Sequence, residues 1–157
     1  MEKSKGLSRM GMKRHKPRQL EHIIQCAVIT QCRYMERKYP ELKCLLAIPN
    51  GGARHIAVAR KLKAEGVKPG ASDLFLALPI PHGPAGLWIE MKAPKGIVST
   101  AQKDFIELMQ WAGFRAIVCW SVDEAMAEIV KYLTQYRAAK TQRDIDADLV
   151  FLKRQAD

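Results

Sequence analysis

The chain has 157 residues, of which 26 are lysine or arginine and 16 are aspartate or glutamate, so its formal net charge is +10. This balance favours a polyanion such as nucleic acid as the partner, and the length suits one domain with one hydrophobic core. With 48% hydrophobic residues the chain is too apolar for wholesale disorder, and its longest apolar run, Leu74 to Ile80, is much shorter than the roughly 18 residues of a membrane-spanning helix.

The first nineteen residues are strongly basic, with seven lysines or arginines against one glutamate, which leaves a net charge of +6. They contain few apolar side chains, so the sequence predicts a flexible arm over residues 1–19. The arm either contacts DNA phosphates or is only a solvated leader. The residues expected to contact DNA are Lys13, Arg14, Lys16 and Arg18. No apolar run follows these charges as in a secretory signal, so we expect a soluble protein in a reducing compartment.

The rest of the chain alternates between helical and extended patterns. Apolar residues recur three and four positions apart from Leu20 until Pro40 stops the run, which predicts the first helix. Apolar runs bounded by glycine and proline predict strands at 43–48, 72–79, 87–92 and 115–120. Helices are expected after the first, third and fourth strands. The order α-β-α-β-β-α-β-α predicts an α/β domain over residues 20–136, followed by a C-terminal extension over residues 137–157.

Cysteines and tryptophans are mostly interpreted as structural. The cysteines show neither C-x-x-C pairing nor zinc-finger spacing, so we expect small buried hydrophobes. They are Cys26, Cys32, Cys44 and Cys119. Trp111 and Trp120 are expected in the core, whereas Trp88 either fills space beside the first helix or stacks on a base.

The strands at 72–79 and 87–92 predict a hairpin that pairs two acidic residues. Asp73 and Glu90 are equidistant from the centre of the intervening turn, so a regular antiparallel register places them roughly opposite each other. Lys92 is two residues beyond Glu90 and projects from the same face. The alternative is a turn residue at Asp73 and a solvated strand face at Glu90 and Lys92.

Facing carboxylates repel each other, and a divalent cation removes this conflict. Mg²⁺ prefers hard oxygen ligands, commonly one or two carboxylates. A bound metal polarises a phosphodiester and lowers the pKa of a bound water, while Lys92 can orient that water or neutralise developing charge. The pattern therefore predicts hydrolysis of phosphodiester bonds.

Four motifs follow one another along the chain, and they support the prediction of a nuclease. They are Ile48 to Gly52, Lys61 to Gly70, Ser72 to Leu76 and Gly86 to Lys92. Together they resemble the virus-type replication-repair nuclease family, VRR-NUC, within the PD-(D/E)XK superfamily, and the resemblance runs from about Leu20 to Leu133. It implies a PD-(D/E)XK restriction-endonuclease-like core, in which helices flank a mixed central β-sheet, that cuts DNA with Mg²⁺ or Mn²⁺. Ser72 stands where the superfamily has proline, a residue that supplies no ligand.

The resemblance also assigns residues. It implies that Asp73, Glu90 and the backbone carbonyl of Met91 bind the metal and that Lys92 is catalytic. Glu21 matches an acidic residue that points from the first helix toward the metal. The other reading of Glu21 is an exposed glutamate in the first helical turn, which the helix dipole favours.

Gln102 matches the glutamine of the helix that follows the hairpin, and this match implies a catalytic role. Ser99 and Gln102 are also spaced as a capping box, in which the glutamine amide returns to the Ser99 backbone. Both interpretations of Gln102 remain open at the level of sequence.

Asn50, Gly51 and Gly52, followed by Arg54, form a second candidate DNA contact. Two glycines in a turn let backbone amides approach a phosphate, and a helix that begins at this point favours an anion. Asn-Gly is equally a common turn signal without a ligand.

These features predict a metal-dependent DNA endonuclease. A compact core has little surface for reading a long sequence, so DNA shape is the expected target. Family resemblance points to branched DNA such as four-way (Holliday) junctions, in the cytoplasm of a bacterial or phage-infected cell. The alternatives are a nick- or flap-directed nuclease and a non-catalytic basic DNA-binding protein on the same fold. We expect a homodimer, because resolving a junction needs two symmetric cuts. The apolar run from Leu149 to Leu152 either supplies that interface or covers the core of its own subunit.

Overall fold

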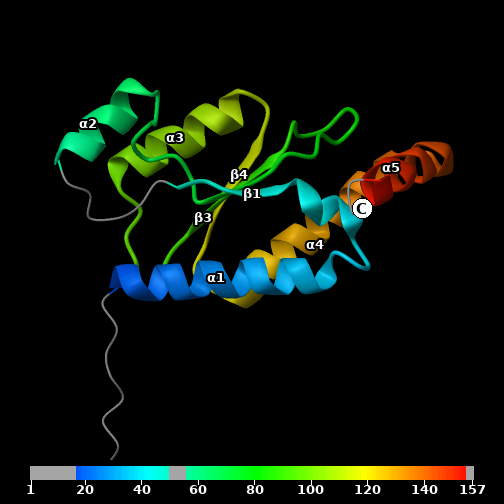
Figure 1. The fold of residues 1–157 in the computed structure, drawn as a ribbon, viewed down its shortest axis with the longest axis horizontal. Helices are drawn as coiled ribbons and strands as arrows, with labels where there is room; N and C mark the ends of the chain where they lie inside the picture. The colour runs from blue at the N-terminus through cyan, green and yellow to red at the C-terminus, as the bar shows by residue number, and fades with distance from the viewer. Residues whose placement is uncertain (1–16, 50–55, 155–157) are drawn as a thin grey trace, which may run out of the picture.

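The computed structural model describes residues 17–49 and 56–154 (Figure 1). The chain folds into helices around one sheet, in the predicted order with two additions, a 3-10 helix before the first strand and a helix at the C-terminus. The elements are α1 (Pro17–Met35), the 3-10 helix η1 (Pro40–Cys44), β1 (Leu45–Ala47), α2 (Ile56–Ala64), β2 (Leu74–Leu76), β3 (Leu87–Met91), α3 (Thr100–Trp111), β4 (Arg115–Cys119), α4 (Val122–Ala139) and α5 (Gln142–Arg154).

The four strands form one mixed sheet in the order β1-β2-β3-β4. β1 pairs with β2 and β2 pairs with β3 in antiparallel fashion, whereas β3 and β4 are parallel. A parallel pair needs a crossover connection, and α3 supplies it between β3 and β4. The predicted mixed sheet flanked by helices is confirmed.

Helices cover both faces of the sheet (Figure 1). The face made by Leu74, Ile89 and Met91 carries the main core, which is completed by buried side chains of α1 and α4. On the opposite face, Phe75 and Trp88 stack with ring centroids 4.2 Å apart, beside the α3 residue Phe105. Residues alternate between these two faces along β3, as the period of two predicts.

Several boundaries differ from those predicted. α1 begins at Pro17, three residues before Leu20, because proline is well suited to the first position of a helix. β2 ends at Leu76 instead of Pro79, because the Leu78 N–H turns back to the Leu76 carbonyl oxygen at 2.9 Å. The Tyr132 hydroxyl of α4 then donates to the Leu78 carbonyl oxygen at 2.9 Å. This bond fixes the loop between β2 and β3 against α4.

The described part of the C-terminal extension contains the helix α5, which packs on the rest of the chain. Lys43 Nζ donates to the Leu152 carbonyl oxygen at 3.0 Å, and the Tyr136 hydroxyl donates to Asp148 Oδ2 at 2.5 Å. Leu152 is buried, whereas Val150 and Phe151 remain exposed. The apolar run is therefore divided between the core and the surface.

Some expectations about buried residues are wrong. Trp111 and Trp120 are exposed. Trp111 is the last residue of α3, and Trp120 is the first residue after β4. Cys26 is exposed on α1 and Cys44 is half-buried, although Cys32 and Cys119 are buried as expected. Trp88 packs under α3 and not beside α1, because its parity places it on the α3 face. None of the described helices has the length and apolar character needed to cross a membrane.

Candidate active site

The predicted pairing of Asp73 and Glu90 follows from the observed register. Leu74 lies opposite Ile89 and Leu76 opposite Leu87, so one further step along the ladder sets Asp73 against Glu90. Strand alternation directs Glu90 and Lys92 to the face opposite the buried Ile89 and Met91. Both acidic residues therefore belong to one site where β3 ends.

Glu90 is the most enclosed charged group of this site, with 1% of its surface exposed. Its Oε1 accepts a hydrogen bond from Lys92 Nζ at 2.9 Å and another from the Gln102 side-chain amide. Its Oε2 is buried and has no hydrogen-bond partner in residues 17–49 and 56–154. A buried oxygen without a donor is costly, so one lone pair of this carboxylate is left for a ligand.

Asp73 is fixed by the backbone of the opposite strand. The Met91 N–H donates to Asp73 Oδ2 at 2.8 Å. The N–H and the carbonyl of one strand residue point to the same side, so the Met91 carbonyl lies on the Asp73 side of β3. The next residue, Lys92, bonds in the other direction, from its N–H to the Cys119 carbonyl oxygen of β4.

Glu21 of α1 also lies at this site, beside Lys92 and the residue that follows it. Its Oε1 accepts the Ala93 N–H at 3.4 Å and lies 3.7 Å from Lys92 Nζ. α1 begins at Pro17, so Glu21 is beyond the first turn, and the reading as a dipole-stabilised first-turn glutamate is wrong. The structure instead brings Glu21 to the lysine of the site.

Gln102 forms the predicted capping box and also contacts Glu90 of the candidate site, while its catalytic role stays a prediction. Gln102 Oε1 accepts a hydrogen bond from the Ser99 backbone N–H at 2.9 Å, and the Gln102 backbone N–H donates to Ser99 Oγ at 3.3 Å. These two bonds form the capping box of α3. Its amide nitrogen donates to Glu90 Oε1. The cap therefore orients the amide that contacts Glu90.

Gly70 lets the strand of Asp73 approach the start of α3. Its φ is +81°, and a Cβ at this position would lie 2.2 Å from the Ala101 carbonyl oxygen. Only glycine fits both the left-handed conformation and this close approach. The sequence identified Gly70 as part of a motif but gave no role for it.

Burial and neighbouring negative charge raise the pKa values of both carboxyl groups of the site. Burial, followed by the charge of Asp73, raises the pKa of Glu90 to about 7. Burial also raises the pKa of Asp73, although the Met91 hydrogen bond and Lys92 oppose the rise. Burial alone would lower the pKa of Lys92, but the hydrogen bond to Glu90 and the surrounding carboxylates raise it overall, so the ammonium remains charged.

The oxygen atoms of Asp73, Glu90 and the Met91 carbonyl are of the kind that a hard divalent cation binds. Asp73 and Glu90 supply carboxylate oxygens, one of them buried without a partner, and the Met91 carbonyl lies on the same side. In the described part of the chain, no three histidine, cysteine, aspartate or glutamate side chains are grouped closely enough to bind one metal ion. The groups that could hold a cation here are therefore two carboxylates and a carbonyl, while Glu21 lies against Lys92.

Seven of the eight predicted DNA contacts lie outside the described residues. Lys13, Arg14 and Lys16 lie outside the described residues, as do Asn50, Gly51, Gly52 and Arg54. Arg18 belongs to the first turn of α1. These contacts stay predictions.

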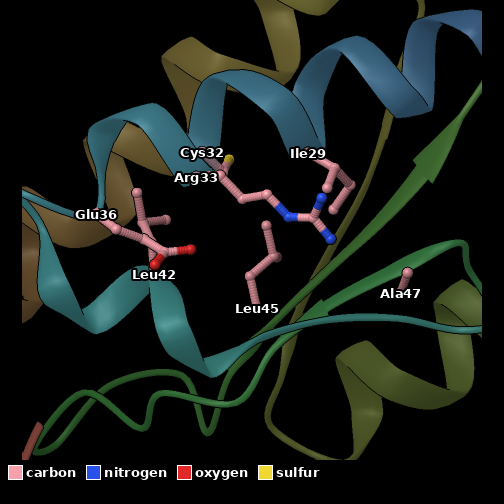
Figure 2. Close-up of a pocket in the computed structure, with 7 residues that line it drawn as sticks. All are labelled: Ile29, Cys32, Arg33, Glu36, Leu42, Leu45 and Ala47. Carbon is pink, nitrogen blue, oxygen red and sulfur yellow. The ribbon is translucent and has the colours of Figure 1, made fainter. Parts of the chain in front are cut away.

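A pocket of about 130 Å³ lies apart from the carboxylates, between α1, η1 and β1 (Figure 2). Arg33 and Glu36 lie at its wall. Arg33 is twelve residues along α1 from Glu21, which corresponds to roughly 18 Å of helix, and Glu36 follows the end of α1. The full lining is Ile29, Cys32, Arg33, Glu36, Leu42, Leu45 and Ala47. The pocket shares none of the predicted site residues.

The chain is similar to known proteins in sequence and in structure. The sequence model of the VRR-NUC domain matches residues 15–123. A solved structure described as a VRR_NUC domain protein superposes with a TM-score of 0.63 and 26% sequence identity, covering 73% of this chain and 88% of the other. Curated proteins gave no match.

Proposed function

Because this chain belongs to the VRR-NUC family of nucleases, we propose that it is a DNA endonuclease that uses Mg²⁺ or Mn²⁺ to hydrolyse phosphodiester bonds. The observation that supports the metal site best is the buried Glu90 Oε2, which has no hydrogen-bond partner among the described residues and belongs to a carboxylate next to Asp73. Asp73, Glu90 and the Met91 carbonyl are the proposed ligands. When bound, the metal supplies Lewis-acid activation of the phosphate and of a water.

The other residues of the site set up the reaction. Lys92 carries a fixed positive charge beside Glu90, where it orients the attacking water or stabilises negative charge developing on the phosphate. Gln102 positions Glu90 by donating to Oε1, and Oε2 is left without a hydrogen-bond partner among the described residues. Glu21 positions Lys92 and the chain that follows it.

The proposed substrate is branched DNA such as a four-way junction. The charge of +10 favours a polyanion, and +6 of it lies in residues 1–19, where Lys13, Arg14, Lys16 and Arg18 are proposed to bind phosphates. Asn50, Gly51, Gly52 and Arg54 are proposed as a second phosphate contact, since they lead to α2. A single small domain reads shape more readily than sequence.

The active unit is proposed to be a symmetric homodimer, because junction resolution requires two related cuts. The exposed Val150 and Phe151 of α5 offer apolar surface for such an interface. A mixed dimer with one Lys92→Ala subunit should nick a junction once without resolving it. Light scattering that finds only a species of 17.7 kDa would contradict the dimer.

The experiment is a cleavage assay on labelled duplex, nicked, flap and four-way-junction DNA, with Mg²⁺, Mn²⁺ or EDTA. We expect metal-dependent cutting that is fastest on the four-way junction. Preference for the nick or the flap would overturn the junction proposal and retain the nuclease. Binding of DNA without cleavage of any substrate in either metal would identify a non-catalytic DNA-binding protein.

A further inference from the structure

Trp120, the first residue after β4, lies beside the candidate active site. β3 and β4 are parallel with Met91 opposite Cys119, and one further step of this register sets Trp120 beside Lys92. Residues opposite each other in a ladder project from the same face. The register therefore places the indole on the face of Glu90 and Lys92, away from the core face of Met91.

The indole also contacts the chain that follows β3. Trp120 Nε1 donates to the Gly96 carbonyl oxygen at 3.3 Å. The Gly96 N–H in turn donates to the Ala93 carbonyl oxygen at 2.7 Å, and a Cβ at Gly96 would lie 3.3 Å from Glu21 Oε1. One tight turn of backbone therefore separates the indole from the carboxylate of Glu21.

Trp120 is fixed in place and yet exposed. Its backbone N–H donates to Glu124 Oε2 at 2.7 Å, at the start of α4, and its indole N–H is bonded to Gly96. With both donors satisfied, 38% of the residue is still exposed, and its neighbour in the turn, Ile97, is 87% exposed. A rigid aromatic side chain whose polar group is already bonded is suited to stack on a flat apolar ligand.

We propose that Trp120 stacks on an unpaired nucleobase next to the phosphodiester bond that is cut. This inference rests on the proposed nuclease function and deepens it, because it names the feature of DNA that the site selects. Bases in an intact duplex stack on each other, so an indole placed beside Lys92 has access only to a base that has left the stack. Such bases occur at flaps and gaps, and at a branch point where a base pair has opened.

The predicted effect is large enough to measure. Stacking of one base on an aromatic side chain contributes roughly 1–3 kcal/mol, which corresponds to about 5- to 150-fold in affinity. Trp120→Leu should lose this affinity for DNA with unpaired bases and keep its affinity for intact duplex. Trp120→Phe retains a ring and should lose much less. Trp111→Leu is the matched control, because Trp111 is 84% exposed but lies nine residues, roughly 13 Å of helix, beyond Gln102 on α3.

The experiment measures binding by fluorescence anisotropy in Ca²⁺, using intact duplex and a flap DNA that carries 2-aminopurine as the first unpaired base. We expect wild type and Trp111→Leu to quench 2-aminopurine fluorescence and to prefer the flap, and Trp120→Leu to lose both properties. Circular dichroism checks the fold of each variant, and the quenching by wild type is a readout that needs no variant.

Absence of quenching by wild-type protein that binds the flap overturns the stacking proposal and leaves the nuclease proposal intact. Equal flap affinity of Trp120→Leu and wild type also overturns it. Failure of wild type to bind either DNA would overturn the proposed function itself, so the two failures are distinguishable.

Discussion

The Gln102 side-chain amide donates a hydrogen bond to Glu90 Oε1 while its oxygen caps α3 through the Ser99 N–H. One amide group therefore connects the start of a helix to a carboxylate of the candidate site. Neither contact excludes the other, because the amide oxygen serves the cap and the amide nitrogen serves Glu90.

The two contacts can be separated by substitution. Gln102→Ala removes both and leaves Lys92 as the only described donor to Glu90, so cleavage should fall about 10–100-fold. Ser99→Ala removes only the hydroxyl of the cap, which costs about 1 kcal/mol of stability and little activity. Cleavage rates and thermal unfolding of both variants provide the test, and equal activity losses would contradict a specific role for the amide.

Gly70→Ala should impair the site without touching a ligand. The new methyl group would overlap the Ala101 carbonyl, which displaces the segment before Asp73 from the start of α3. Gly113→Ala is the matched control, because Gly113 has a similar positive φ of +86° with nothing within 4 Å of the added Cβ. Gly113→Ala should lose roughly 1 kcal/mol of unfolding free energy from the positive φ alone, and Gly70→Ala should lose more because of the overlap. Only Gly70→Ala should lose cleavage activity in the folded protein. Full activity in Gly70→Ala would show that this contact does not position Asp73.

Metal affinity should depend on pH through Glu90. The pKa of about 7 in the metal-free protein means that a proton competes with the cation for this carboxylate below neutral pH. Affinity for Mg²⁺ or Mn²⁺ should therefore fall about tenfold per pH unit below 7 and level off above 8. Titration calorimetry at pH 6 in two buffers of different ionisation enthalpy should detect release of about one proton, which Glu90→Gln should abolish. Affinity that is constant from pH 6 to 8 would contradict the assignment of Glu90 as a ligand.

Removal of residues 1–16 should weaken DNA binding and flatten its salt dependence. The deletion removes six of the seven basic residues of the arm and leaves α1 complete from Pro17. Each lost phosphate contact lowers the slope of log affinity against log salt by about 0.9 on duplex DNA. A variant of full length with these six residues changed to glutamine should behave in the same way. An unchanged slope in both variants would assign the arm as a solvated leader.

The hairpin of the site was predictable because a regular ladder depends only on spacing. Asp73 and Glu90 are equidistant from the turn, and the register extended from Leu74 and Ile89 sets them opposite each other even though β2 is shorter than predicted. The faces were predictable for the same reason, since alternation places Met91 in the core and Glu90 in the site.

Contacts between distant segments were not predictable from local pattern. Trp120 was expected in the core, but whether an aromatic residue at the end of a strand is covered depends on the layer above it, which the sequence of β4 does not encode. The bond from Trp120 to Gly96 and the approach of Gly70 to Ala101 join segments 24 and about 30 residues apart. The contacts of Glu21 with Lys92 and Ala93 likewise depend on the angle at which α1 crosses the sheet edge, which the local sequence does not encode.

The central claim is that Asp73 and Glu90 form the metal site of a DNA endonuclease, and the most direct test is single-turnover cleavage of a labelled four-way junction by Asp73→Asn. This change removes a charged ligand and keeps the acceptor for the Met91 N–H, so the fold and DNA binding should persist. We predict that wild type cuts in Mg²⁺ and not in EDTA, and that Asp73→Asn loses nearly all cleavage at low Mg²⁺. Cleavage by Asp73→Asn at the wild-type rate would contradict the account.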